Sequence, residues 1–431
     1  MSLPPNNLKF LAVIFTSCVV EVLFQLGSLL SSLPGLSKSR FARQLTGRTT
    51  GGDSTKSIAP SNPESRGDLL FFCSSAGEFE QALPIIERLS THLGLEPLVL
   101  FLSRSGLEYM RARGETIRAA LAPPDSLWRW RRFESRHRIC ASVVIRHEWW
   151  PSFLSVFGRN RPMFLIDAGR PAGSPDSKLR NLGRGYLARQ FTRICAVDEA
   201  SRDFFVKRFQ INPPQIVATG DTKFDRVMDR ATRTKIGGDL RNQVLNFTRG
   251  RKVLVAGSIY TADLDLLTAA WRTNPDIATS WAVIAVPHHI DGGTTTKLQN
   301  QIQLAGCDFL LINQMGVLAE LYSLADAAWI GGACHNKVHN VLEPASHGLN
   351  LGCGMRFTNS PEAVQMERAG ILRAVATSDE QAEWLMNMTA QHADGASTKS
   401  SPSRSFVIER TGASKKICSL LEQSLTTMEG I

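Results

Sequence analysis

The stretch that decides the fold class runs Ala327-Ala328-Trp329-Ile330-Gly331-Gly332-Ala333-Cys334-His335-Asn336-Lys337-Val338-His339-Asn340-Val341-Leu342-Glu343-Pro344. Its first four residues form a short apolar run, which is typical of a buried strand. A helix-like segment follows, so the two glycines occupy a strand-to-helix turn. In an open α/β sheet such a turn binds phosphate, because glycine allows close backbone approach and a helix N-terminus presents N–H groups to an anion.

The helix-like segment adds a second nucleotide signal. His339 and Glu343 are four residues apart and would share one helix face. The Glu343 carboxylate there would accept hydrogen bonds from the two hydroxyls of a ribose. The alternative is a plain glycine turn before a helix whose polar residues are solvated, since short glycine motifs often match by chance.

Apolar runs alternate with helix-like segments along most of the chain, which favours parallel sheets covered on both faces. The pattern restarts after residues 215–250, so we expect two similar doubly wound halves. The strand-like runs are 69–73, 98–102, 140–145 and 163–166 in the first half, and 252–256, 281–286, 309–312 and 327–330 in the second. We therefore predict domains at 67–225 and 226–425, the latter including a terminal helix.

The first 36 residues are predicted to be a membrane anchor. Residues 8–35 are largely apolar and long enough to reach into or across a bilayer, although Glu21 weakens the prediction of a simple span. Basic residues after the segment favour the cytoplasmic side for the rest of the chain, hence the cytoplasmic face of an inner membrane. Residues 37–66 are rich in Gly, Ser, Thr and Pro and are interpreted as a linker.

Charge and cysteine content narrow the class of partner. The net charge is +10, which favours an anionic partner such as nucleic acid, an acidic membrane surface or a phosphorylated substrate. The eight cysteines are scattered without a C-x-x-C pair, which favours a reducing compartment. Five arginines within 129–138 are interleaved with Trp128, Trp130 and Phe133. This pattern suits anionic lipid headgroups and also resembles a nucleic-acid footprint, and the alternative is a solvated helix face.

Ser74-Ser75-Ala76-Gly77-Glu78 follows the first strand and places a carboxylate at the start of the next helix. At the carboxyl edge of a parallel sheet, Glu78 is a candidate general base towards an acceptor hydroxyl. The alternative interpretation is electrostatic, since a glutamate in the first helical turn complements the helix dipole.

Three other clusters of polar residues follow strand-like runs. They are Arg146-His147-Glu148-Trp149-Trp150-Pro151, Thr219 to Asp225 with Lys223, and Pro287-His288-His289. Each has an alternative as a rim of solvated charge or a surface turn. The spacing of His335 and His339 also suits a metal, but no third ligand is evident and no metal is predicted.

Taken in order, these motifs resemble the 3-deoxy-D-manno-octulosonic acid (Kdo) transferases of lipopolysaccharide synthesis. The resemblance covers residues 67–425. In the first half, Ser75–Glu78 resembles S-V-G-E, Glu148–Pro151 resembles E-x-W-P, and Asp167–Arg170 loosely resembles N-A-R. Further along, Thr219–Asp225 resembles T-G-N-x-K-F-D, and Gly331-Gly332 with 339–344 resembles G-G…H-N-x-L-E-P. The resemblance implies an N-terminal membrane anchor and a GT-B fold of two Rossmann-like domains. It also implies inverting, metal-free transfer of Kdo from CMP-Kdo to a lipid A precursor, with no cofactor and no nucleic-acid partner.

The resemblance also implies roles for particular residues. Glu78 would be the catalytic base. Acceptor or sugar binding would fall to Ser75, Gly77, Glu148, Arg170 and Lys223. Nucleotide binding would fall to Ser258, Pro287, His288, His289, Met315, Gly316, Gly331, Gly332, His339, Asn340 and Glu343.

The chain departs from the family pattern at four positions. His288 stands at the arginine of P-R-H, Val317 at the glutamate of M-G-E, Tyr260 at the histidine of S-T-H, and Arg146 at the first glutamate of E-T-E. A neutral histidine does not reproduce the fixed charge of arginine on a phosphate. Two alternatives therefore remain, a GT-B transferase for another nucleotide sugar and a catalytically impaired, membrane-associated binding homologue.

Overall fold

The computed structural model describes residues 55, 58–59, 62–146, 148–158, 161–170, 178–391 and 401–429. The predicted anchor, residues 1–36, lies outside the described residues, as does most of the predicted linker, 37–66. Within the described ranges, no helix has both the length and the apolar character that crossing a bilayer requires.

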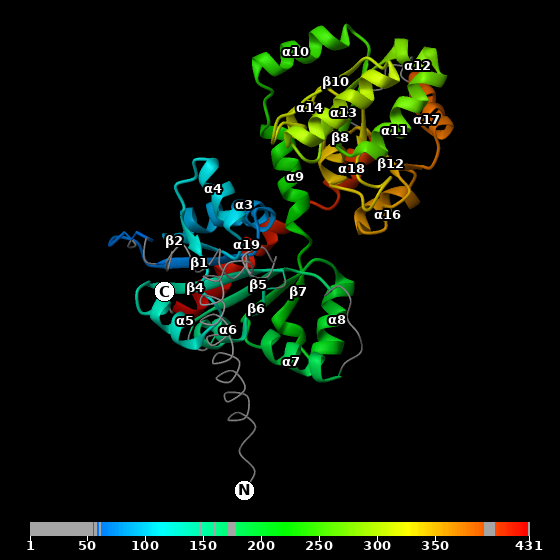
Figure 1. The fold of residues 1–431 in the computed structure, drawn as a ribbon. Helices are drawn as coiled ribbons and strands as arrows, with labels where there is room; N and C mark the ends of the chain where they lie inside the picture. The colour runs from blue at the N-terminus through cyan, green and yellow to red at the C-terminus, as the bar shows by residue number, and fades with distance from the viewer. Residues whose placement is uncertain are drawn as a thin grey trace, which may run out of the picture. The chain divides into compact units, whose positions relative to one another are not determined.

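The chain folds into two compact units (Figure 1). Unit 1 comprises residues 1–223 together with 412–431, and unit 2 comprises residues 224–411. The boundary lies two residues before the predicted one at 225, in the first turn of α9. It falls there because the long α9, Thr222–Arg233, begins directly after the last strand of unit 1.

Unit 1 contains a seven-stranded sheet in the order β3-β2-β1-β4-β5-β6-β7, with every pair parallel. Its strands are β1 Asp68–Cys73, β2 Glu96–Phe101, β3 Arg118–Leu121, β4 Ile139–Ile145, β5 Met163–Ala168, β6 Arg193–Ala196 and β7 Ile216–Ala218. Its helices are α3 Ala76–Leu93, α4 Arg104–Ala112, α5 Leu127–Glu134, α6 Pro151–Phe157, α7 Lys178–Ala188, α8 Glu199–Phe209, η3 Pro213–Gln215 and α19 Ala413–Glu429.

Unit 2 contains a six-stranded parallel sheet in the order β10-β9-β8-β11-β12-β13. Its strands are β8 Lys252–Ile259, β9 Trp281–Pro287, β10 Phe309–Leu311, β11 Ala327–Ile330, β12 Asn350–Gly354 and β13 Leu372–Val375. Besides α9, its helices are α10 Gly238–Thr248, α11 Thr261–Thr273, α12 Pro275–Ser280, α13 Gly292–Ala305, α14 Leu318–Tyr322, α15 Leu342–Ser346, α16 Pro361–Arg368, α17 Ser378–Gln391 and α18 Pro402–Ile408.

Both sheets are buried on both faces, as the apolar strand runs predict. In β1, Leu69 and Phe71 pack towards α3, α4 and α19, whereas Leu70 and Phe72 pack towards α5, α6 and α8. In β8, alternate residues likewise enter two separate cores of unit 2. The eight predicted strands are all present, and the structure adds β3, β6, β7, β12 and β13.

One predicted domain assignment is wrong: the terminal helix belongs to unit 1, not to the second domain at 226–425. The apolar side of α19 carries Ile417, Cys418, Leu421 and Leu425 into the core formed with β1 and α3. Glu422 on the same helix pairs with Arg88 of α3 at 3.4 Å. An amphipathic helix docks on whichever apolar surface complements its stripe, so chain order alone did not decide its unit.

Candidate active site

The strand order of unit 1 creates a topological switch point beside β1. The chain leaves β1 towards β2 and β3 on one side, while β4 to β7 continue on the other. Ligands of open α/β sheets bind at the carboxyl ends of the strands at such a point. The loops there hold Ser74 to Glu78, directly after β1, and Arg146 with Glu148, directly after β4.

Glu78 lies in the first turn of α3 and takes part in the capping of that helix. Its Oε2 accepts a hydrogen bond from the backbone N–H of Ser74 at 2.5 Å, and the Oγ of Ser75, the N-cap, accepts one from the Glu78 N–H. Burial raises the pKa of Glu78, against the lowering effect of the Ser74 bond. Glu78 therefore does stabilise the start of α3, as the electrostatic interpretation predicts. The same geometry leaves its carboxylate partly buried, with a pKa raised towards the values that suit a general base.

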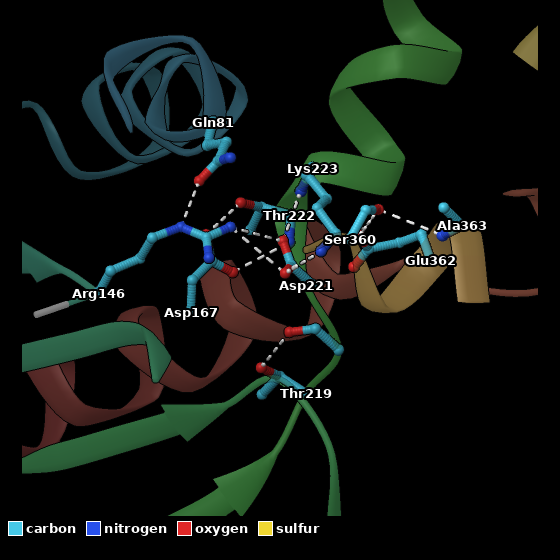
Figure 2. A network of polar contacts seen from close by, with 11 residues as sticks. Gln81, Arg146, Asp167, Thr219, Asp221, Thr222, Lys223, Ser360, Glu362 and Ala363 are labelled. Carbon is cyan, nitrogen blue, oxygen red and sulfur yellow. Dashed lines mark hydrogen bonds and ion pairs between the residues drawn. The ribbon is translucent and has the colours of Figure 1, made fainter. Parts of the chain in front are cut away.

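A network of buried charge lies at the same edge of the sheet (Figure 2). Nη2 of Arg146 donates to both oxygens of Asp221, at 3.1 and 3.3 Å, and its Nε donates to Gln81 at 3.0 Å. Asp167 is fully buried and accepts from both the N–H and the hydroxyl of Thr222. Burial, with the nearby Asp221, raises the pKa of Asp167 to about 7.

The backbone at two of these positions is strained. Arg146 has φ 61° and Asp167 has φ 51°, both in the left-handed region that non-glycine residues rarely adopt. They occupy the ends of neighbouring strands, β4 and β5. Backbone strain of this kind concentrates at functional sites, which favours a site at this edge.

The other predicted residues of unit 1 have varied surroundings. Lys223 pairs with Asp221 at 3.1 Å, and Glu148 accepts from the indole N–H of Trp150 at 3.1 Å. Arg170 is exposed after β5. A Cβ added to Gly77 would meet only the Ser75 hydroxyl, at 3.9 Å, so packing does not require glycine there.

In unit 2 the equivalent switch point lies between β8 and β11. The glycine turn follows β11, as predicted, and both of its N–H groups already donate to acceptors within unit 2. Gly331 donates to the Gly257 carbonyl and Gly332 to Oδ2 of Asp263, each at 2.9 Å. Glycine is needed instead for close packing, since a Cβ at Gly331 would collide with the Ser258 backbone and Gly332 has φ 92°.

The predicted helix also begins later than expected. The five-residue α15 starts at Leu342, so His339 lies in the preceding loop and does not share a helix face with Glu343. The side chain of Asn340 accepts from the Leu342 N–H at 3.1 Å, which holds the loop open ahead of the helix. The predicted start of this helix near His339 is therefore wrong, and phosphate binding by His339 stays a prediction.

The Glu343 carboxylate pairs with Arg230 of α9 at 3.1 Å. A second guanidinium nitrogen of Arg230 donates to the Gly316 carbonyl at 3.4 Å. Arg230 thus connects two predicted nucleotide-binding segments, Met315-Gly316 and the α15 turn. Met315 itself is exposed, and Val317 is buried in the core where the family has a glutamate.

Four imidazoles surround the ring of Tyr260. His335 and His339 stack on it at 5.2 and 5.7 Å between ring centroids, and His288 and His289 lie at 5.1 and 6.0 Å. Burial first, and then the neighbouring His288, Lys337 and His289, lower the pKa of His339 to about 4. Burial also lowers the pKa of His288. At neutral pH these two rings are therefore uncharged.

The structure thus brings three of the predicted nucleotide-binding residues together, His288, His289 and His339, around Tyr260. Ser258, with φ 55°, and the buried Pro287 end the strands beneath them. Sequence reasoning treated Tyr260 only as a departure and missed Asp263 and Arg230. The buried Asp263, between two apolar residues in a helix-like run, was the available signal.

Among the described residues, two other kinds of site are relevant, a metal site and a surface cavity. In the ranges that the structure covers, no group of three or more His, Cys, Asp or Glu is placed to hold a metal ion. A cavity of about 590 Å³ in unit 2 is lined by residues of α11, α17 and the adjoining loops, and no predicted donor residue lines it.

The arginine-rich segment forms α5 and the turn after it. Trp130 and Phe133 are buried in the core of unit 1, so they do not belong to the predicted basic face. Trp128 is 55% exposed, and Arg131, Arg132, Arg136 and Arg138 are exposed. The surface that remains is cationic with one aromatic side chain.

Known proteins resemble the chain in both sequence and structure. The family described as 3-deoxy-D-manno-octulosonic-acid transferase (kdotransferase) matches residues 40–226. The 3-deoxy-D-manno-octulosonic acid transferase of Aquifex aeolicus is 26% identical over 322 residues, covering 71% of this chain and 82% of the relative. That of Haemophilus influenzae is 23% identical over 337 residues, covering 72% and 76%.

Solved structures agree on the fold. A glycosyltransferase from Rickettsia africae aligns with a TM-score of 0.56 at 12% identity, covering 84% of this chain and 98% of that one. A UDP-GlcNAc 2-epimerase from Neisseria meningitidis aligns with a TM-score of 0.60 at 14% identity, covering 83% and 100%. The two doubly wound units therefore have the architecture of GT-B glycosyltransferases. In its ordered motifs and its sequence relatives, the chain is similar to the 3-deoxy-D-manno-octulosonic acid transferases.

Proposed function

We propose that the protein is an inverting glycosyltransferase that moves Kdo from CMP-Kdo to a lipid A precursor in lipopolysaccharide synthesis. The similarity of the chain to Kdo transferases supports the coarse part of this proposal, a Kdo glycosyltransferase. One observation carries the chemistry: Glu78 is a partly buried carboxylate at the carboxyl edge of a parallel sheet, with its pKa raised by burial.

The proposed step balances without a cofactor. The acceptor hydroxyl gives its proton to a carboxylate oxygen of Glu78, and its oxygen attacks the anomeric carbon of Kdo. The bond from that carbon to the CMP phosphate oxygen breaks, and CMP leaves with the electron pair. Attack opposite to the leaving group inverts the configuration at the anomeric carbon.

Unit 2 supplies the proposed donor-binding groups. Imidazole N–H groups of His288, His289 and His339 donate to the phosphate, and Tyr260 presents a flat ring beside them. Glu343, oriented by Arg230, binds the ribose hydroxyls. In unit 1, Ser75, Gly77, Glu148, Arg170 and Lys223 are proposed to contact the acceptor or the Kdo carboxylate.

We further propose that the protein acts at the cytoplasmic face of the inner membrane. The apolar residues 8–35 and the exposed cationic surface of α5 support this location. A phosphorylated lipid acceptor would be attracted to that surface. Nucleic acid is not a proposed partner, because only the net charge favours it, whereas the motifs favour a nucleotide sugar and a lipid acceptor.

The test is a transfer assay with CMP-Kdo and a tetraacylated lipid A precursor, read by mass spectrometry. The expected product is heavier than the acceptor by one or more Kdo residues. Competition with CMP, UDP and GDP identifies the donor nucleotide, and only CMP should inhibit strongly. Inhibition by UDP or GDP instead would replace the donor in this proposal.

One observation favours a second candidate, a catalytically impaired binding homologue. Val317 is 4% exposed in the core, where the family has a glutamate, and His288 stands at the family arginine. Binding of CMP without release of CMP from CMP-Kdo in the presence of the lipid acceptor would support this candidate.

A further inference from the structure

Arg146 joins three parts of unit 1 through its side chain and backbone (Figure 2). Its Nε donates to Gln81 of α3, and its Nη2 donates to Asp221, in the loop after β7. Its own N–H donates to the Ile166 carbonyl of β5 at 3.0 Å. Arg146 makes these contacts from a left-handed backbone, φ 61°, and strain of this kind concentrates at functional sites.

The contact with Gln81 brings Arg146 to the helix turn that carries Glu78. Gln81 lies three residues after Glu78 in α3, and residues at this spacing are neighbours on one helix surface. Figure 2 shows Gln81 pointing from its helix towards the Arg146 guanidinium. The Arg146 guanidinium therefore links Asp221 to the N-terminal part of α3, at Gln81.

The charges around Arg146 are matched to this position. Asp221, Asp167 and Glu78 all stabilise its charged form electrostatically, in that order of strength. Asp221 is also held from the other side by Lys223, at 3.1 Å. The guanidinium thus lies among three carboxylates, one of which is the candidate base.

We propose that Arg146 is a positioning residue for the transfer reaction, which fixes the Glu78 carboxylate by clamping the first turn of α3 to Asp221. The proposal rests on the proposed function, since it assigns Glu78 the role of base. It gives a role to a position where the chain departs from its family pattern, with arginine in place of glutamate.

The clamp also has an electrostatic consequence for Glu78. The groups that act on this carboxylate are the Ser74 N–H, Glu148 and Arg146, and Glu78 in turn acts on the buried Cys73 thiol. Glu148 raises the pKa of Glu78, whereas Arg146 lowers it. Removing Glu148 should therefore lower the pKa of Glu78, and removing Arg146 should raise it.

The test compares Arg146→Met, Arg146→Lys and Glu148→Gln with wild type in the pH dependence of kcat/KM. For Arg146→Met we expect the acidic limb to move to higher pH and the rate on that limb to fall, because Arg146 lowers the pKa of Glu78. For Glu148→Gln the limb should move to lower pH. Arg146→Lys should restore the position of the limb, because it keeps the charge, but not the full kcat, because it loses the fork that holds Gln81 and Asp221 together.

Arg113→Met is the matched control. Arg113 follows α4 and pairs with Glu80 of α3 at 2.6 Å. Its replacement therefore removes a guanidinium that contacts α3 but leaves the contacts of Gln81 and Asp221 in place. Its pH profile should coincide with that of wild type. An unshifted limb in Arg146→Met, or an equal shift in Arg113→Met, would overturn the proposal.

A structural measurement keeps the inference separate from the proposed function. Amide hydrogen exchange in residues 76–82 should speed up in Arg146→Met and in Gln81→Leu, but not in Arg113→Met. If wild type transfers Kdo and neither exchange nor the pH limb responds to Arg146, the positioning role fails and the function stands. If wild type shows no transfer with CMP-Kdo, the proposed function fails, and the exchange data still decide whether the clamp exists.

Discussion

The backbone N–H of Gly332 donates to Oδ2 of Asp263 at 2.9 Å, within a buried part of unit 2. The same carboxylate accepts from the N–H of Tyr260 at 3.0 Å, and its other oxygen faces the indole N–H of Trp329 at 3.4 Å. One buried side chain therefore ties the glycine turn after β11 to the loop that carries the ring at the centre of the histidine cluster.

Replacing Asp263 with Ala should destabilise unit 2 and disturb this cluster. Two backbone N–H groups would lose their acceptor in a buried place, which costs on the order of 2–4 kcal/mol of unfolding free energy. Urea unfolding measures the loss. Asp265→Ala, on the exposed side of the same helix, is the control and should change stability by less than about 0.5 kcal/mol. Equal stability of the two variants would refute the role given to Asp263.

Two glycines in the predicted site should respond differently to alanine. Gly331→Ala places a Cβ against the Ser258 backbone, so it should lower both stability and CMP affinity. Gly77→Ala meets almost nothing and should leave the free energy of unfolding within about 0.5 kcal/mol of wild type. If Gly77 leaves room for the acceptor, its variant should still raise the KM for the lipid. Thermal melts and acceptor titrations separate these outcomes.

His339 should make the protein less stable in mild acid. Its pKa is about 4 in the folded chain, against about 6.5 when unfolded, so between these values the unfolded chain binds more protons. The stability that follows is complete above about pH 6.5 and is lost as the pH falls towards 4. His339→Gln should reduce this loss, as seen in melting temperatures from pH 7 to pH 4.5. His92→Gln, at an exposed ring, is the control, and identical slopes in wild type and His339→Gln would contradict the prediction.

Asp167 should make the protein less stable as the pH rises, which is opposite to the effect of His339. Its pKa is raised to about 7 by burial and by Asp221, so the folded chain retains a proton that the unfolded chain releases above about pH 4. This contribution is present at low pH and is lost as the pH rises through 7. In Asp167→Asn the amide oxygen still accepts from the Thr222 N–H, and the amide nitrogen donates to the Thr222 hydroxyl oxygen. The asparagine cannot ionise, so the melting temperature should fall less than that of wild type between pH 5 and pH 8. Asp203→Asn, at an exposed carboxylate, should follow wild type.

The strands and the order of the site loops could be predicted from sequence, because apolar runs and strand-end motifs are local signals. The runs at 69–73 and 327–330 became β1 and β11 within a residue. Short or polar strands were missed: Asn350–Gly354 contains two glycines and Arg193–Ala196 has only four residues, and both are strands because neighbours on each side complete the sheet.

The sequence could not predict which distant residue each hydrogen-bonding group or apolar face contacts. A sequence shows that Gly331 and Gly332 follow a strand, but not that Gly257 and Asp263 already accept their N–H bonds. It shows an amphipathic terminal helix, but not that its stripe matches the core beside α3. Such facts depend on contacts between distant residues, which a local pattern does not encode.

Glu78→Gln is the sharpest test of the proposed chemistry. Glutamine has the same shape, and its carbonyl oxygen still accepts from the Ser74 N–H, so α3 should start normally and the variant should melt close to wild type. It cannot take up the acceptor proton, and turnover should fall by at least about a hundredfold while CMP affinity is unchanged. Glu80→Gln alters the next carboxylate on the same helix, which pairs with Arg113, and should keep turnover within about twofold. Retained transfer by Glu78→Gln, with transfer by wild type established, would move the base to another residue, and the partly buried Glu148 would be examined next because it lies at the same switch point.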